Sequence, residues 1–167
     1  MSHLEKIKGK IFPDFQSFRP LLLKWRASHE TIVFTNGCFD ILHPGHIDYL
    51  SKSADKGDRL VVGLNSDESV KLLKGASRPV MKQEERAFLL AALSFADAVV
   101  LFYEETPYNL ISQILPDVLI KGNDYQINEI AGFDVVLENG GRVETIQLVP
   151  NYSTSSIIKK LKESGDG

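Results

Sequence analysis

The chain has 167 residues, of which 43% are hydrophobic and 25% are charged, and its formal net charge is −3. This length predicts one domain with a substantial core, and the weakly acidic balance gives no electrostatic reason to expect a nucleic-acid partner. No apolar run approaches the roughly 20 residues of a membrane span, so we expect no membrane partner. The single cysteine, Cys38, excludes an intrachain disulfide and fits a reducing compartment, and we expect a cytoplasmic location.

Short apolar runs alternate with helical patterns along the whole chain. In chain order, we predict a helix over 15–29, a strand over 31–35, a helix over 45–56, a strand over 59–64, helices over 67–73 and 82–93, a strand over 98–102, a helix over 107–114, a strand over 117–121, a helix over 129–138, a strand over 142–148 and a helix over 154–163. We expect looser order at 1–14 and 164–167.

Strands that alternate with helices predict an α/β protein with a parallel sheet. We therefore expect a Rossmann-like, doubly wound, five-stranded parallel sheet with helices on both faces. One domain would span residues 1–167, with its core over about 30–162 and an N-terminal helical extension over about 1–29. In such a sheet the ligand lies beyond the carboxyl ends of the strands.

Two histidines, His43 and His46, stand three residues apart where the first predicted core strand gives way to a helix. A strand, a tight loop and a helix start bring backbone N–H groups and a helix dipole together, which is a setting for phosphate. Pro44 fixes the loop, and Gly45 lets the backbone approach a phosphate without an intervening side chain. The alternative is a pair of surface or capping histidines with no ligand.

The segment His43-Pro44-Gly45-His46, preceded by Asn36-Gly37-x-Phe39-Asp40, matches the HxGH signature of the nucleotidyltransferase superfamily. The chain further resembles the adenylyltransferases that make ADP-heptose, over roughly residues 25–161. The similar segments are Val61 to Ser69, then Lys71, Lys74, Gly75, Arg78, Pro79 and Glu85-Arg86, then 115–125, Ile130-Ala131-Gly132 and 153–158.

This resemblance implies a reaction. Members of the family transfer AMP from ATP to D-glycero-D-manno-heptose 1-phosphate and release pyrophosphate, and the product feeds lipopolysaccharide or other surface glycans. No protein nucleophile is needed, because a sugar-phosphate oxygen attacks the α-phosphorus in line. The resemblance also implies Mg²⁺, held mainly by the triphosphate with no ligand assigned to the protein, and a homodimer. ATP and a sugar 1-phosphate are thus the expected partners.

The resemblance assigns roles residue by residue. His46 corresponds to the histidine that stabilises the transition state at the α-phosphate, His43 to the one on the β-phosphate side, and Lys74 to a clamp for the reacting phosphates. The expected nucleotide-binding residues are Thr35, Asn36, Gly37, Cys38, Phe39, His43, Gly45, His46, Lys121, Gly122, Ser153, Thr154 and Ser155. The expected acceptor-binding residues are Asp40, Lys71, Lys74, Arg78, Arg86 and Asp124.

Several of these residues also have a structural interpretation. Asp40 would hold its loop, Lys71 would be a solvated charge, and Arg86 would form a salt bridge on a helix surface. Ser153 would be an ordinary helix N-cap. We treat Cys38 as a small, partly buried side chain, because a nucleophilic role would need a covalent mechanism that the family does not use.

Two departures from family patterns bear on the substrate. The similar cytidylyltransferases carry an Arg-Thr pair where this chain reads Val149-Pro150-Asn151-Tyr152, which counts against glycerol-phosphate or choline-phosphate substrates. The heptose enzymes commonly have Thr-Asn where this chain has Ser155-Ser156. Two alternatives stay open, a cytidylyltransferase acting on glycerol 3-phosphate or a related polyol phosphate, and a non-catalytic nucleotide-binding module.

Overall fold

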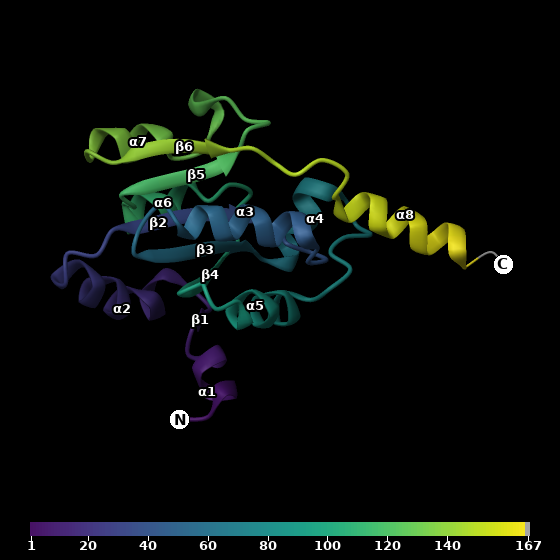
Figure 1. Cartoon of the computed structure of the whole chain (residues 1–167), viewed down its shortest axis with the longest axis horizontal. Coiled ribbons are helices and arrows are strands. Elements are labelled where there is room, and N and C mark those ends of the chain that lie inside the picture. Colours follow the sequence, from purple (N-terminus) through teal and green to yellow (C-terminus); the bar gives the residue numbers. More distant parts are fainter. Residues whose placement is uncertain (166–167) are drawn as a thin grey trace.

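The computed structural model describes residues 1–165 and contains one parallel sheet. Its strands are β1 (Ile11–Phe12), β2 (Ile32–Gly37), β3 (Arg59–Asn65), β4 (Ala98–Phe102), β5 (Val118–Gly122) and β6 (Arg142–Ile146). They lie side by side in the order β1-β4-β3-β2-β5-β6, and every neighbouring pair is parallel (Figure 1). The predicted α/β class with a parallel sheet is confirmed.

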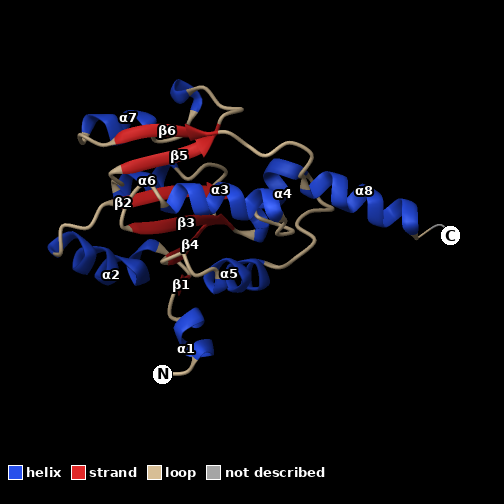
Figure 2. Ribbon diagram, viewed as in Figure 1, coloured by secondary structure: helices blue, strands red, loops and turns tan. Residues whose placement is uncertain are grey.

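Helices connect the strands and cover both faces of the sheet (Figure 2). They are α1 (His3–Lys8), α2 (Phe15–Ala27), α3 (Pro44–Ala54), α4 (Asp67–Lys74), α5 (Gln83–Ala92), α6 (Tyr108–Ile114), the short 3₁₀ helix η1 (Ile127–Glu129), α7 (Phe133–Glu138) and α8 (Thr154–Ser164). Buried side chains of α2, α6 and α7 join one core cluster, and those of α3 and α5 join the other. The sheet is therefore the middle layer of three.

The two clusters follow from the alternation of side chains along each strand. In β2, Ile32 and Phe34 pack into the cluster with α2 and α6, while Val33 packs into the cluster with α3 and α5. All three side chains are fully buried. A continuous apolar run is what a strand needs when helices cover both faces, which explains why these strands read as short, unbroken hydrophobic segments.

The N-terminal region differs from the prediction. Residues 1–14, expected to be loosely ordered, form α1 and the edge strand β1, whose Ile11 and Phe12 pair with Val99 and Val100 of β4. The sheet therefore has six strands within residues 1–165 and not five. At the other end, α8 continues to Ser164. Residues 166–167 of the segment expected to be loosely ordered lie outside the described residues.

The helix predicted over 129–138 is also wrong in its first half. The structure has η1, a break, and then α7, which begins after Gly132. Gly132 has φ +84°, and a Cβ there would lie 2.6 Å from the Ile111 side chain. The positive φ and the close packing end one helical segment and start another, where the apolar spacing alone suggested a single helix.

The topology brings the ligand site to one place. From β2 the chain winds through β3 and β4 on one side of the sheet, and β5 and β6 lie on the other side. The loops that follow β2 and β5 therefore diverge at the carboxyl edge, which is the switch point where doubly wound sheets bind ligands. No helix within residues 1–165 combines the length and apolar character needed to cross a membrane.

Candidate active site

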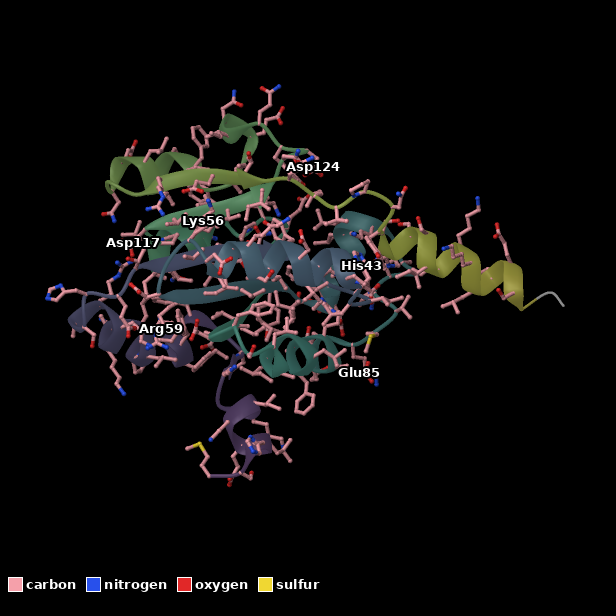
Figure 3. All side chains as sticks on the ribbon, in the orientation of Figure 1. His43, Lys56, Arg59, Glu85, Asp117 and Asp124 are labelled. Atoms are coloured by element: carbon pink, nitrogen blue, oxygen red, sulfur yellow. The ribbon has the colours of Figure 1, made fainter. Side chains whose placement is uncertain are left out.

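A cavity of about 380 Å³ opens at this carboxyl edge. Its walls come from the loop after β2, the start of α3, the loop after α4, the loop after β5 and the start of α8. Figure 3 shows His43 and Asp124, both lining residues, at the arrowhead end of the sheet, whereas Asp117 and Arg59 lie at the opposite end. The volume is in the range of small-molecule sites.

Most of the residues assigned from the sequence meet in this cavity although they are distant along the chain. Those that line it are Asn36, Gly37, Cys38, Phe39, Asp40, His43, Gly45, His46, Lys74, Arg78, Lys121, Gly122, Asp124, Ser153, Thr154 and Ser155. Three residues do not line it, namely Thr35, Lys71 and Arg86.

The two histidines stand together at the start of α3. Their rings stack with centroids 3.7 Å apart and planes 19° apart. His43 is the residue before the first turn of α3, and the backbone N–H of His43 donates to Nδ1 of His46 over a long 3.4 Å. Phe39 packs edge-on against His46, with ring centroids 5.3 Å apart. The loop and the helix start therefore hold both imidazoles on one wall of the cavity.

Burial disfavours the protonated form of both imidazoles. Burial first, and then the nearby His43 and Lys74, together lower the pKa of His46 to about 4. Burial also lowers the pKa of His43. A neutral imidazole still has one N–H to donate to a phosphate oxygen, and a bound polyphosphate would raise both pKa values because it favours the charged form.

Gly45 leaves no room for a side chain between the histidine and the far wall. A Cβ at this position would lie 2.9 Å from Cβ of Tyr152 and 3.0 Å from the ring of His43. Any larger residue would therefore displace the His43 ring or the segment that leads into α8. This contact gives a physical reason for glycine within the HxGH segment, in addition to backbone access for a ligand.

The cavity is locally basic although the whole chain is acidic. Lys74, Arg78 and Lys121 line it, and Nζ of Lys121 donates to the carbonyl oxygen of Asn36 at 3.3 Å. Burial lowers the pKa of Lys121. Burial also raises the pKa of the Cys38 thiol, so this cysteine is not an activated nucleophile.

Two buried polar atoms of residues that line this cavity have no partner. Within the described part of the chain, Nδ1 of His43 and Nη2 of Arg78 are buried side-chain atoms without a hydrogen bond. A buried polar group left unsatisfied costs free energy, so such atoms are rare in a finished core. Both residues line the same cavity, so the two unpaired nitrogens belong to its wall, although neither atom is itself exposed to it.

The start of α8 forms a further wall of this cavity. Ser153 is the N-cap, because its Oγ accepts from the backbone N–H of Ser156 at 3.0 Å. Its hydroxyl is therefore engaged in capping, which is the structural alternative anticipated for it. The groups at this helix start that could still donate to a bound anion are the hydroxyls of Thr154 and Ser155 and the first backbone N–H groups.

Asp40 lines the cavity, yet its carboxylate is committed to protein partners. It accepts from Nε of Arg78 at 2.7 Å and from the backbone N–H groups of Val80 and Met81 at 2.9 Å. Burial acts to raise the pKa of Asp40, but these donors outweigh it, so that the pKa lies below its ordinary value. Asp40 thus fixes the loop that presents Arg78, which is its structural interpretation, and its contact with the acceptor stays a prediction.

The expected assignment of Arg86 is corrected. Its side chain is fully buried and does not reach the cavity. The guanidinium donates to the carbonyl oxygens of Met81, Cys38 and Asn65 and to the carboxylate of Asp67. It therefore ties the loop after β2 to the ends of β3 and α5, and its expected contact with the acceptor is replaced by a positioning role.

Thr35 and Lys71 also lie elsewhere. Thr35 is fully buried, and its hydroxyl lies 2.7 Å from the Tyr49 hydroxyl, so it connects β2 to α3 and does not face a nucleotide. Lys71 is exposed on α4, away from the cavity lining, as expected for a solvated charge. Both assignments were drawn from sequence neighbours of true lining residues, which share the segment but point elsewhere.

The sequence reasoning missed the aromatic walls. Tyr152 stacks over His43 with ring centroids 6.0 Å apart, and Nζ of Lys121 lies 5.2 Å from the ring centroid of Tyr125. Leu148 and Val149 complete an apolar side of the cavity. Their positions in the sequence could have identified both tyrosines as lining residues. Tyr152 directly precedes the hydroxyl-rich start of α8, and Tyr125 follows the strand that carries Lys121.

No protein metal cage accompanies the cavity. Among residues 1–165, no group of three or more His, Cys, Asp or Glu side chains is arranged to hold a metal ion. Asp40, the buried carboxylate in the lining, is already paired with Arg78. A divalent cation at this site would therefore depend on oxygens that a ligand brings with it.

These features define a class of protein: a doubly wound α/β domain whose switch-point cavity is lined by two imidazoles, two helix starts and three cationic side chains, a combination that suits phosphate-bearing substrates. A model of the family described as cytidylyltransferase-like matches residues 34–160. The chain belongs to this cytidylyltransferase-like family.

Individual relatives agree with this assignment. The bifunctional protein HldE of Methylobacillus flagellatus is 55% identical over 137 residues, which is 82% of this chain and 28% of that protein. The protein of the same name from Syntrophotalea carbinolica is 51% identical over 146 residues, 87% of this chain and 30% of that protein. The chain thus spans less than a third of the length of these curated relatives.

Solved structures share the fold. The lipopolysaccharide core biosynthesis protein from Thermoplasma volcanium superimposes with a TM-score of 0.59 at 29% identity, covering 74% of this chain and 99% of that one. The pantoate-beta-alanine ligase from Francisella tularensis, complexed with beta-gamma ATP and beta-alanine, gives a TM-score of 0.59 at 13% identity, covering 91% of this chain and 76% of that one. At 13% identity the second likeness concerns the fold alone.

Proposed function

We propose that this protein transfers AMP from ATP to D-glycero-D-manno-heptose 1-phosphate, giving ADP-heptose and pyrophosphate. The observation that carries the proposal is one cavity lined by the stacked imidazoles of His43 and His46, by Lys74 and by two helix starts. Such a cavity suits a polyphosphate, because each of these groups stabilises negative charge.

The reaction needs positioning and charge stabilisation more than covalent chemistry. An oxygen of the sugar phosphate attacks the α-phosphorus, and the bond from that phosphorus to the α–β bridging oxygen breaks. His46 donates to the α-phosphate as charge develops there, and His43 binds the β-phosphate side. Thr154, Ser155 and the first N–H groups of α8 hold the leaving pyrophosphate.

The metal enters with the nucleotide. We propose that Mg²⁺ is bound mainly by triphosphate oxygens, since the described residues form no metal cage of their own. When bound, it would neutralise charge on the triphosphate. Lys74 and Lys121 would then neutralise the charge that the metal leaves uncovered.

The choice of nucleotide and sugar rests on similarity. The segments shared with ADP-heptose-forming adenylyltransferases run through the loops that line the cavity, and the relatives named HldE are about half identical to this chain. The neighbouring structure named for lipopolysaccharide core biosynthesis supports a role for the product in surface-glycan synthesis. A cytoplasmic, homodimeric enzyme is part of the same proposal, and sedimentation equilibrium would test the dimer.

A cytidylyltransferase acting on glycerol 3-phosphate is the second candidate, favoured only by the family description. Pyrophosphate release with Mg²⁺ separates the two when ATP and CTP are each crossed with heptose 1-phosphate and glycerol 3-phosphate. We expect turnover with ATP and heptose 1-phosphate alone. Turnover only with CTP and glycerol 3-phosphate would replace the proposal, and binding of nucleotide without turnover for any pair would favour a non-catalytic module.

A further inference from the structure

A second cavity, of about 480 Å³, lies against the first. The two share one wall, formed by Asn36, Gly37, Cys38, Lys74, Lys121 and Tyr125. Beyond this wall the second cavity is built from other elements, including the end of β3, the loop after β4 and the segment around η1. None of the histidines and none of the residues at the start of α8 line it.

The positive and negative side chains of this second cavity lie in different parts of its lining. Its cationic lining residues, Lys74 and Lys121, both belong to the shared wall. Its carboxylates, Glu105 and Glu129, belong to the part that the first cavity does not share. An anionic group is therefore stabilised at the shared wall, whereas a second anionic group farther in would meet carboxylates and be repelled.

A buried amide adds a specific hydrogen-bonding group. Asn65 lines the cavity with only 2% of its surface exposed, and its Nδ2 donates to Oγ of Ser69 at 2.9 Å. Within residues 1–165 no donor bonds to its side-chain oxygen, which is thus available to a ligand. Together with two carboxylates and the Thr106 hydroxyl, it forms a set of acceptors for which hydroxyl groups are the matching donors.

We propose that this second cavity binds the polyhydroxylated body of the acceptor sugar, with the sugar phosphate at the Lys74–Lys121 wall and the hydroxyls toward Glu105, Glu129 and Asn65. The inference rests on the proposed function, because it presumes a sugar-phosphate acceptor. It relocates the acceptor from the Asp40 and Arg78 side of the first cavity, which the sequence suggested, to the other side of the shared wall.

This placement predicts the side from which the sugar phosphate attacks the α-phosphorus. The attacking oxygen, carried by the phosphate at the shared wall, approaches the α-phosphorus from the second cavity, whereas the start of α8, assigned to pyrophosphate, lines only the first. The new bond joins that oxygen to the α-phosphorus, and the bridging oxygen leaves with the electron pair of the broken bond. The sugar phosphate reacts as an anion, so no protein base has to remove a proton.

The test is equilibrium binding, which does not require turnover. Heptose 1-phosphate and α,β-methylene-ATP, an analogue that resists cleavage between the α and β positions, are each titrated by calorimetry with Mg²⁺. In Glu105→Ala we expect Kd for the sugar phosphate to rise by about tenfold, as for loss of a charged hydrogen-bond acceptor. Kd for the nucleotide analogue should stay within twofold. Within the described residues, the hydrogen bonds from the Tyr103 backbone and the Asn109 side chain go to the neighbouring Glu104 and not to Glu105, so removal of the Glu105 carboxylate should not disturb the fold.

Two further variants sharpen the result. Glu129→Gln keeps an oxygen to accept the backbone N–H of Gln126, a contact of 3.1 Å in this structure, while removing the charge. It should also weaken sugar-phosphate binding alone. Glu138→Ala, an exposed carboxylate on α7 outside both cavities, is the matched control and should change neither Kd.

The outcomes separate this inference from the proposed function. Unchanged sugar-phosphate binding in both Glu105→Ala and Glu129→Gln would overturn the acceptor site, even if the wild-type protein makes ADP-heptose. A rise in Kd for the nucleotide analogue instead would place the nucleoside in this cavity. Absence of wild-type binding to heptose 1-phosphate, with or without the nucleotide analogue, would refute the proposed function and the inference together.

Discussion

The imidazole rings of His43 and His46 lie stacked with their centroids 3.7 Å apart, at the start of the helix that faces the cavity. Two charged rings at this distance would repel each other, and the structure disfavours protonation of both. A bound polyphosphate would reverse that balance, because its negative charge favours the protonated imidazoles. The proposed role of the pair as a phosphate-binding element therefore predicts changes in both kinetics and protonation.

Loss of the second histidine should affect the chemical step. In His46→Ala we expect kcat to fall by about 10²–10³ with a modest change in KM, as for removal of a transition-state donor. Steady-state pyrophosphate release measures both constants, and His3→Ala, at an exposed histidine in α1, is the control. A variant with unchanged kcat and raised KM would contradict the role given to His46.

Nucleotide binding should take up protons. The pKa of His46 is about 4 in the unliganded protein, below its ordinary value of 6.5, so the ring is neutral at pH 6.5–7.5. A bound triphosphate raises this pKa, and the complex therefore binds more protons than its separated components. Calorimetry with ATP in buffers of different ionisation enthalpy should show this uptake, and His46→Gln should reduce it. Equal uptake by the two proteins would assign the proton to another group.

The lowered pKa of His46 also determines how the free energy of unfolding changes with pH. The unfolded chain binds a proton at His46 near pH 6.5, while the folded protein does so only near pH 4. The free energy of unfolding should therefore decrease as pH falls from about 6.5 toward 4. Urea titrations across this range should show a smaller loss for His46→Gln, and parallel curves would refute the assignment.

Asp40 should matter for stability. Its carboxylate is fully buried and paired with Arg78, whose side chain is 12% exposed, so Asp40→Ala leaves a buried charge and two backbone donors unpaired. We expect the free energy of unfolding to fall by about 3 kcal/mol, as for a broken buried pair. Urea denaturation measures this loss. Asp48→Ala, which breaks an exposed pair with Lys52, should cost no more than about 0.5 kcal/mol.

Arg86→Lys separates a positioning role from contact with the acceptor. Lysine cannot reproduce the planar guanidinium that donates to three carbonyl oxygens and Asp67, so we expect a loss of about 2 kcal/mol in the free energy of unfolding. Arg142→Lys, at a side chain 54% exposed, should be nearly neutral. A variant of wild-type stability with a raised KM for the sugar phosphate would restore the acceptor contact expected from the sequence.

Local patterns in the sequence predict much of this fold. Strands β2 to β5 are largely buried under helices on both faces, so each contains a short apolar run, and the predicted strand over 98–102 coincides with β4. The edge strand β1 has only two residues, too few to show any alternation. The break before α7 depends on the packing of Gly132 against Ile111, a tertiary contact that local spacing does not reveal.

The residues of the site likewise fall into those that local sequence patterns predict and those that depend on tertiary contacts. Residues at the carboxyl ends of strands and on the loops that follow, such as Lys121 and His43, were predictable because parallel strands bring these ends to one edge. The destinations of Asp40 and Arg86 were not, since each is decided by partners 38 to 48 residues away, Arg78 and the Cys38 carbonyl. The second cavity also escaped prediction, because its lining residues carry no motif of their own.

The most direct test of the central claim is a single turnover with α-labelled ATP, Mg²⁺ and heptose 1-phosphate, quenched in acid. Direct transfer to the sugar phosphate predicts that the label passes from ATP to ADP-heptose, with pyrophosphate formed in equal amount and no label on the protein. Label retained on the protein, or released as free AMP, would contradict a displacement in which the two histidines act on ATP while the sugar phosphate attacks.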